Sequence, residues 1–198
     1  MDETAERSIG KALEYGALRV VAGFLLLIPF TLRARLMEVF ARFLFSLSKR
    51  YRSLVQDHLQ LAFPEKSRDW ILDMSRRNAA TMGRLFAELI QTPSVNAAFF
   101  SRRFAIENEE LQREIFARGG IAILGHLGNW EWHGLLGARL AGRPIYTIVK
   151  RHTNFWSNRY AEKSRNEVGM RLIYVDQNPF EIVRLLRRGE FVAFTSDQ

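Results

Sequence analysis

The chain has 198 residues, no cysteine, and a formal net charge of +8 at pH 7. The missing cysteines exclude disulfides, thiol nucleophiles and thiolate metal sites, and an apolar content of 47% excludes a disordered chain. The length suits one sizeable core, and the positive charge favours anionic partners such as a phospholipid surface, nucleic acid or a phosphate-bearing substrate.

The N-terminus begins with a polar segment of mixed charge at residues 1–16, followed by an apolar run at residues 17–32. The uncharged part of this run, residues 20–32, is shorter than the roughly 20 residues of a typical spanning helix. No small-residue cleavage pattern of a secretory signal follows it. Three interpretations stay open for this run: a marginal membrane span, an anchor in the plane of the membrane, or a buried core helix.

The next segment combines positive charge with large apolar side chains. Its cations are Arg33, Arg35, Arg42, Lys49, Arg50 and Arg52, and its apolar residues are Leu36, Val39, Phe40, Phe43, Leu44, Phe45 and Leu47. This pattern is typical of a helix that lies on anionic lipid, so it favours a membrane-anchoring segment over residues 17–52. The alternative is an ordinary helix that packs this apolar face on the domain. If the preceding run spans a membrane, the positive-inside rule places the body of the protein in the cytoplasm.

Two helices are predicted in the next part of the chain. Ser67 is a suitable N-cap for a long helix that reaches Ile90, and Pro64 and Pro93 bracket it. Asn108 is a suitable cap for a second helix that ends at Gly119-Gly120.

From Gly120 onward, short apolar runs alternate with helical stretches. The predicted strands are Ile121–Leu124, Ile145–Val149, Leu172–Val175 and Phe191–Thr195, and the predicted helices between them are Asn129–Leu140, Asn154–Val168 and Asn178–Arg188. This alternation indicates an α/β fold with a mainly parallel sheet and flanking helices.

The first predicted strand ends in the sequence Gly125-His126-Leu127-Gly128-Asn129-Trp130-Glu131. On a continuous helix, a spacing of five residues turns a side chain by about 140°, so His126 and Glu131 converge only if the chain turns between them. The glycines at 125 and 128 permit such a turn. A base and a carboxylate would then lie at the carboxyl end of a strand, where open α/β sheets place their sites. The alternative is a histidine that satisfies a strand end and a glutamate near a helix N-terminus.

Other kinds of site fit this segment less well. His126, Glu131 and His133 do not form the His-Glu-x-x-His pattern of a catalytic zinc site, so we expect no metal. The glycines form neither a dinucleotide fingerprint nor a P-loop, and no serine stands in a nucleophile-elbow pattern.

The block from Gly125 to Glu131 resembles the signature of the bacterial lipid A biosynthesis acyltransferases, the lauroyl and myristoyl transferases that complete lipid A. That family is similar to the wider glycerolipid and lysophospholipid acyltransferase superfamily with its His-four residues-Asp motif. Shorter stretches also resemble family elements: Leu59–Glu65, Arg165–Gly169 and Asp197-Gln198. The resemblance covers roughly residues 15–198.

The resemblance implies catalytic roles for two residues. His126 would deprotonate the acceptor hydroxyl, and Glu131 would orient the histidine and balance its charge. The hydroxyl would then attack an acyl thioester, and the backbone around Gly128 and Asn129, or Arg165, would stabilise the oxyanion. Arg165 would alternatively bind a phosphate. Lys150 and Arg151 belong to the same expected substrate-binding set.

The resemblance also implies partners and a location. The donor would be acyl carrier protein or acyl-CoA, the acceptor a phosphorylated glycolipid such as a lipid A precursor, and the site the cytoplasmic face of the bacterial inner membrane. We expect no cofactor and no nucleic acid partner. Residues 53–198 would form the acyltransferase α/β domain, incomplete at its C-terminus. The alternatives are another phospholipid or glycolipid acceptor, or a non-catalytic basic protein that binds membranes or nucleic acid.

Overall fold

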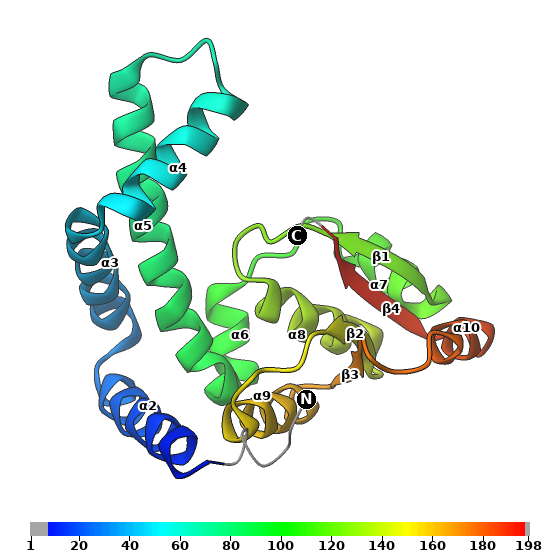
Figure 1. Cartoon of the computed structure of the whole chain (residues 1–198). Helices are drawn as coiled ribbons and strands as arrows, with labels where there is room; N and C mark the ends of the chain where they lie inside the picture. Colours follow the sequence, from blue (N-terminus) through cyan, green and yellow to red (C-terminus); the bar gives the residue numbers. More distant parts are fainter. Residues whose placement is uncertain (1–7, 197–198) are drawn as a thin grey trace. The chain divides into compact units, whose positions relative to one another are not determined.

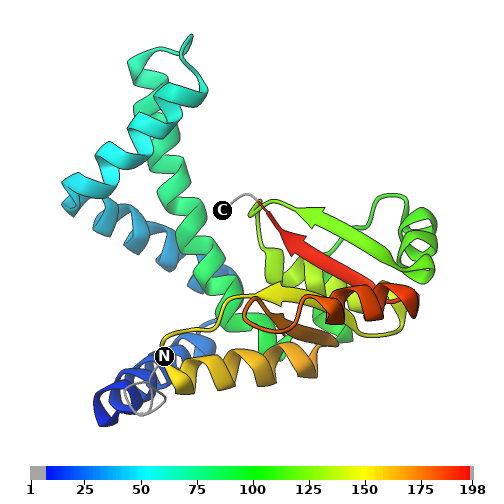
Figure 2. The same cartoon turned by 45° about the vertical axis from the view of Figure 1, so that its right-hand side comes forward.

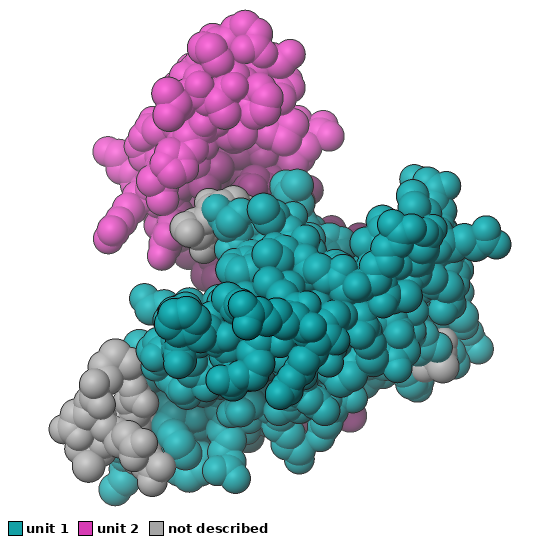
Figure 3. Space-filling view, turned by 90° about the vertical axis from the view of Figure 1, so that its right-hand side faces the viewer, with its two compact units in different colours: residues 1–21, 92–198 teal, residues 22–91 magenta. Residues whose placement is uncertain are grey.

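The computed structural model describes residues 8–196, so Asp197 and Gln198 and the first seven residues of the polar N-terminus lie outside the described residues. Residues 22–91 form one compact unit, and residues 1–21 with 92–198 form the other (Figure 3). These units divide the chain by packing, whereas the predicted segments 1–16, 17–52 and 53–198 divide it by function. The functional boundaries therefore stay a prediction.

The unit of residues 22–91 is helical. It contains α3 (Phe30–Leu47), α4 (Lys49–Ala62) and α5 (Arg68–Gln91), and α2 (Ile9–Leu27) ends in it. Helices α3 and α5 pack so closely that a Cβ atom on Gly83 would lie 2.2 Å from the carbonyl oxygen of Met37. The hydroxyl of Ser67 accepts from the backbone N–H of Trp70 at 3.3 Å, which confirms the predicted start of α5.

Arg33 departs from the predicted basic face because it lies inside this unit, with 1% of its surface exposed. Its guanidinium donates to the carbonyl of Leu25 at 3.1 Å and to the side-chain oxygen of Gln91. Burial lowers the pKa of Arg33. Arg33 is thus a buried link between the ends of the helices rather than a surface cation.

The apolar residues of α3 stay largely at the surface. Leu36, Val39, Phe40, Phe43 and Leu47 are all exposed. None of the helices within residues 8–196 is both long and apolar enough to cross a membrane.

The other unit contains a parallel sheet of four strands (Figure 1). The strands are β1 (Gly120–Leu124), β2 (Ile145–Val149), β3 (Met170–Tyr174) and β4 (Phe191–Thr195), in the order β1-β4-β2-β3. Each pairing is parallel, with Gly120 opposite Phe191 and Ile145 opposite Met170. The predicted parallel α/β fold is confirmed.

Alternate strand residues point to opposite sides of the sheet, and helices pack on both faces, although Ile121 and Ile123 of β1 stay 55% and 75% exposed. On one face, Ala138 of α8 (Trp130–Ala141) and Phe116 of α7 (Glu109–Arg118) pack on a cluster with Ile145 and Phe191. On the other face, Leu185 of α10 (Phe180–Arg187) packs on Ile173 and Val192. Helix α9 (Phe155–Glu167) contacts β3, and Figure 2 shows it beside that strand.

Two local features of this unit differ from the predictions. Asn108, the predicted cap of α7, has a left-handed φ of 51° and makes no side-chain capping bond. The short helix α6 (Ala97–Arg103) was not predicted, and Trp132 holds this region through a hydrogen bond from its indole nitrogen to the Thr92 hydroxyl at 3.1 Å.

Candidate functional site

A cavity of about 580 Å³ opens at the carboxyl ends of the strands. The residues that line it at the strand ends are Leu124, Val149, Lys150, Val175, Phe194 and Thr195, and His126, Glu131, His152 and Arg165 also line it. Its size and mixture of apolar walls and a few charged groups are typical of a small-molecule site. The predicted position of the site, at the carboxyl edge of the sheet, matches this cavity.

The turn between β1 and α8 places the two predicted catalytic residues. Gly128 has a φ of 63°, a left-handed conformation that glycine adopts without a Cβ clash. Asn129 is the N-cap of α8, and its side-chain oxygen accepts from the backbone N–H of Trp132 at 3.1 Å. His126 lies before the turn and Glu131 in the first turn of the helix, so both side chains line the same cavity.

The ring of His126 packs edge-to-face against Trp130, with ring centroids 4.8 Å apart and planes at 76°. The imidazole is half-buried. Contact with a neighbouring aromatic ring restricts the rotamers of the histidine, which favours a fixed position at the cavity wall.

Glu131 is buried, and its carboxylate is held by Arg165 of α9. The Nε atom of Arg165 donates to both carboxylate oxygens, at 3.1 Å and 2.8 Å, and Nη2 also donates to Oε1. Burial opposes the charge of Arg165, but the hydrogen bonds and negative charge of Glu131 outweigh it and raise the pKa of Arg165. The cavity thus contains a paired, permanently charged guanidinium.

The structure brings Arg165 to Glu131, an arrangement that the sequence did not predict. Arg165 uses Nε and Nη2 for the carboxylate, while its Nη1 atom has no hydrogen-bond partner within residues 8–196. The third nitrogen can therefore donate to an anion in the cavity. The orientation of His126 by Glu131 stays a prediction.

The two remaining predicted cations lie at the end of β2. Lys150 lines the cavity, whereas the guanidinium of Arg151 bonds Asp176 at 3.0 Å and stacks on the ring of Tyr174, 3.7 Å from its centroid. A substrate-binding role for Arg151 stays a prediction, and its side chain is occupied by these two contacts.

His152 is a residue of the cavity that the sequence analysis missed. Its backbone N–H donates to the side-chain oxygen of Asn158 at 3.0 Å, which fixes the chain just after β2. Burial lowers the pKa of His152, the nearby charge of Arg165 lowers it further, and Glu131 acts in the opposite direction. The available signal was its position: His152 follows Lys150 and Arg151 directly after a predicted strand.

We predict that His152 titrates below the usual histidine pKa of 6.5. Because the folded state disfavours its proton, the stability that this group contributes is complete above pH 6.5 and is lost as the pH falls from 6.5 to the lowered pKa. Replacing Glu131 by glutamine removes a negative charge that favours the imidazolium, so the pKa of His152 should fall further. NMR titration measures both values, since the chain has four histidines and each can be assigned by substitution. A pKa that rises in Glu131→Gln would contradict this electrostatic picture.

Within residues 8–196, no three His, Asp or Glu side chains gather closely enough to hold a metal ion. The groups that line the cavity instead are two imidazoles, a lysine and a carboxylate–guanidinium pair. An imidazole can accept and return a proton, and the cations can bind or stabilise negative charge.

No curated protein matches the chain. The family model described as bacterial lipid A biosynthesis acyltransferase matches residues 9–198, which include the cavity and the whole segment from Gly125 to Glu131. The chain therefore belongs to the bacterial lipid A biosynthesis acyltransferase family, whose members transfer acyl groups to lipids.

Proposed function

We propose that this protein moves a fatty acyl chain from an acyl thioester, carried by acyl carrier protein or coenzyme A, to a hydroxyl of a lipid A precursor or related glycolipid. The observation that carries the proposal is the common cavity of His126, Glu131 and Arg165 in a member of an acyltransferase family. Membership of that family also removes the non-catalytic alternative.

His126 is the proposed general base. Its imidazole takes the proton of the acceptor hydroxyl as the hydroxyl oxygen attacks the thioester carbonyl carbon. The tetrahedral intermediate then collapses, the carbon–sulfur bond breaks, and the imidazolium returns the proton to the thiolate that leaves. Glu131 supplies negative charge in the same cavity, which stabilises the imidazolium and orients the ring.

The oxyanion needs hydrogen-bond donors. The proposed donors are the backbone amides around Gly128 and Asn129, at the N-terminus of α8, where the helix dipole favours negative charge. The Nη1 atom of Arg165 is the second proposed donor. It is held in place because the other two nitrogens of the same guanidinium are bonded to Glu131.

The proposed acceptor carries phosphate groups, and the cavity offers cations for them. Lys150 lines the cavity at the end of β2 and has no carboxylate partner within residues 8–196. Its ammonium can therefore bind a phosphate without first losing an ion pair.

The proposed location is the cytoplasmic face of the inner membrane. The support is the exposed apolar side of α3, with Leu36, Phe40, Phe43 and Leu47, in a chain of net charge +8. Large apolar side chains beside cations favour binding to an anionic bilayer surface.

The test is acyl transfer by the purified protein from radiolabelled acyl–acyl carrier protein and acyl-CoA, in parallel reactions. The acceptors are a phosphorylated lipid A precursor and a lysophospholipid, both dispersed in detergent. We expect a labelled ester on the glycolipid. Labelling of the lysophospholipid alone would replace the proposed acceptor, and absence of transfer from both donors would contradict the proposal.

A further inference from the structure

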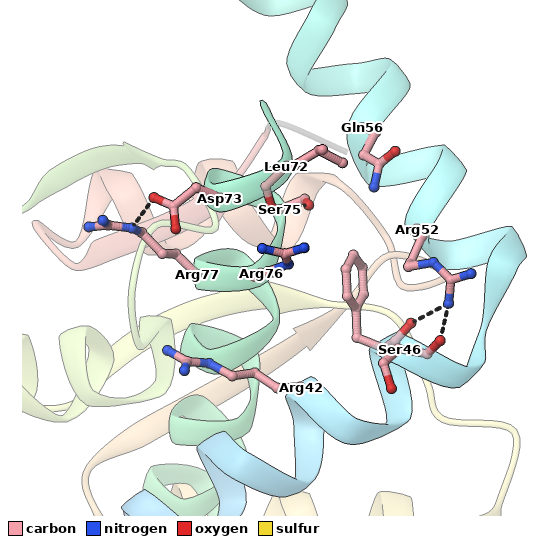
Figure 4. Close-up of a pocket in the computed structure, with 10 residues that line it drawn as sticks. Arg42, Ser46, Arg52, Gln56, Leu72, Asp73, Ser75, Arg76 and Arg77 are labelled. Atoms are coloured by element: carbon pink, nitrogen blue, oxygen red, sulfur yellow. Dashed lines mark hydrogen bonds and ion pairs between the residues drawn. The ribbon is translucent and has the colours of Figure 1, made fainter. Parts of the chain in front are cut away.

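The helical unit of residues 22–91 contains a cavity of about 640 Å³ between α3, α4 and α5 (Figure 4). Four arginines line it: Arg42 from α3, Arg52 from α4, and Arg76 and Arg77 from α5. Asp73 is the acidic residue among its lining residues. The lining therefore has an excess of three positive charges, which favours an anionic ligand.

The four arginines differ in their contacts. Arg77 bonds the carboxylate of Asp73 at 2.7 Å, and Arg52 donates to the carbonyl of Phe45 at 3.3 Å and to that of Ser46 at the C-terminal end of α3. Arg42 and Arg76 are exposed and have no hydrogen-bond or ion-pair partner within residues 8–196. These two guanidinium groups are therefore available to an incoming anion, and their planar donor pairs match phosphate oxygens.

The helix that carries Arg42 also carries an exposed apolar stripe. Residues on a helix are rotated by about 100° per position, so Leu36, Phe40, Phe43 and Leu47 share one side of α3. Ala41 and Met37 lie on another side, against Gly83 of α5. By the same rotation Arg42 lies on a third side, roughly 120° from each of the other two, so α3 has a core side, a basic side and an exposed apolar side around its axis.

We propose that the cavity lined by Arg42, Arg52, Arg76 and Arg77 binds the phosphate of an anionic phospholipid headgroup. The apolar stripe beside it would enter the acyl-chain region of the same bilayer leaflet. A free phosphate would use the arginines alone, whereas a lipid uses both the arginines and the exposed phenylalanines of the same helix α3. The apolar stripe therefore favours a lipid as the source of the phosphate. The inference rests on the proposed membrane association and not on acyl transfer.

The experiment is flotation of the full chain with phosphatidylcholine vesicles that contain or lack phosphatidylglycerol. The test variant is Arg42→Gln with Arg76→Gln. Its matched control is Arg50→Gln with Arg68→Gln, which removes the same charge from exposed arginines of the same unit that do not line the cavity. We expect the test variant to lose about tenfold or more in affinity for phosphatidylglycerol vesicles, because it loses the charge-assisted hydrogen bonds from both guanidinium groups to the headgroup phosphate, in addition to the attraction of its charge to the surface. The control variant should lose clearly less.

Several results would overturn the inference. Equal losses in the test and control variants would mean that net charge, not the cavity, attracts the membrane. Wild-type protein that binds neither kind of vesicle would overturn both the headgroup site and the proposed membrane association. The assay contains no acyl donor, so none of these results depends on whether the protein transfers acyl groups. Circular dichroism of each variant confirms that it is folded.

Two further arms identify the source of the phosphate. Inorganic phosphate, added at constant ionic strength against chloride, should not displace the wild-type protein from phosphatidylglycerol vesicles, and complete displacement would identify free phosphate as the ligand and overturn the lipid proposal. Phe40→Ser with Phe43→Ser should weaken vesicle binding, because both side chains are exposed and available to the bilayer. Unchanged binding of this variant would contradict insertion of the apolar stripe.

Discussion

Replacement of His126 by alanine is expected to lower the kcat for acyl transfer by about 10²–10⁴-fold, the range for removal of a general base. The fold should survive, because the side chain is half-buried at the wall of an open cavity rather than in either hydrophobic cluster. The measurement is single-turnover transfer of a labelled acyl chain, with circular dichroism on the same sample. A folded His126→Ala protein with near-native transfer would refute the assignment of the base.

The matched control is His133→Ala. His133 is exposed on α8, two residues beyond Glu131, and does not line the cavity. Its replacement should leave transfer nearly unchanged. Glu131→Gln should also reduce kcat, and the double variant with His126→Ala should be barely slower than His126→Ala alone, because residues that act as one unit have non-additive effects.

Replacement of Glu131 by alanine is expected to lower the free energy of unfolding by about 3–5 kcal/mol, because it leaves the guanidinium of Arg165 buried without its counter-ion. The side chains of Arg165 and Glu131 are only 17% and 10% exposed, so water screens the pair weakly. Glu131→Gln keeps one carbonyl oxygen as an acceptor and should cost less. Urea unfolding followed by tryptophan fluorescence measures the change, and two of the four tryptophans, Trp130 and Trp132, flank Glu131.

A surface ion pair of the same chemistry provides the control. Arg113 donates to Glu109 at 3.0 Å within α7, with side chains 55% and 47% exposed. Glu109→Ala should lower the free energy of unfolding by about 1 kcal/mol or less, as exposed pairs typically do. Equal losses for Glu131→Ala and Glu109→Ala would show that the pair in the cavity gains nothing from its burial.

Most of the α/β fold could be predicted from the sequence because its strands are short apolar runs with clear ends. The bounds of β2 and β4 agree with the predicted runs at Ile145–Val149 and Phe191–Thr195. The strand β3 begins earlier than predicted, at Met170, because the exposed Arg171 interrupts the apolar pattern while Met170 lies buried against Gly134.

The missed helix α6 had one local signal, its N-cap Asn96, whose side-chain oxygen accepts from the backbone N–H of Phe99 at 2.9 Å. Helix α6 has seven residues, too few for a helical periodicity to show, and a hydrogen bond between the distant Trp132 and Thr92 holds its neighbourhood. The order of the strands could not be predicted either, because it depends on tertiary contacts. The residues of Phe191–Thr195 do not indicate that this strand pairs with both β1 and β2.

The candidate site could be predicted only in part. The turn at Gly128 and the cap at Asn129 follow from residue types, so the positions of His126 and Glu131 were predictable. The bond between Glu131 and Arg165 joins residues of two different helices, and residue spacing contains no information about it. The basic helix was predicted as a surface feature, but Arg33 is buried. Its partners, Leu25 and Gln91, lie on other helices, so the pattern within the basic segment gives no sign of this burial.

The strand order β1-β4-β2-β3 has a consequence for how the protein acquires its structure. Strand β1 is made first but has β4 as its neighbour, and α8, α9, α10 and two other strands are synthesised between them. While the chain emerges from the ribosome, the backbone of β1 therefore has no strand to pair with until Phe191–Thr195 has been synthesised. Contacts so distant in sequence slow folding and expose apolar strand surface in the meantime. Insertion of β4 between β1 and β2 thus joins β1 to the other described strands and brings the carboxyl ends of these four strands around the cavity.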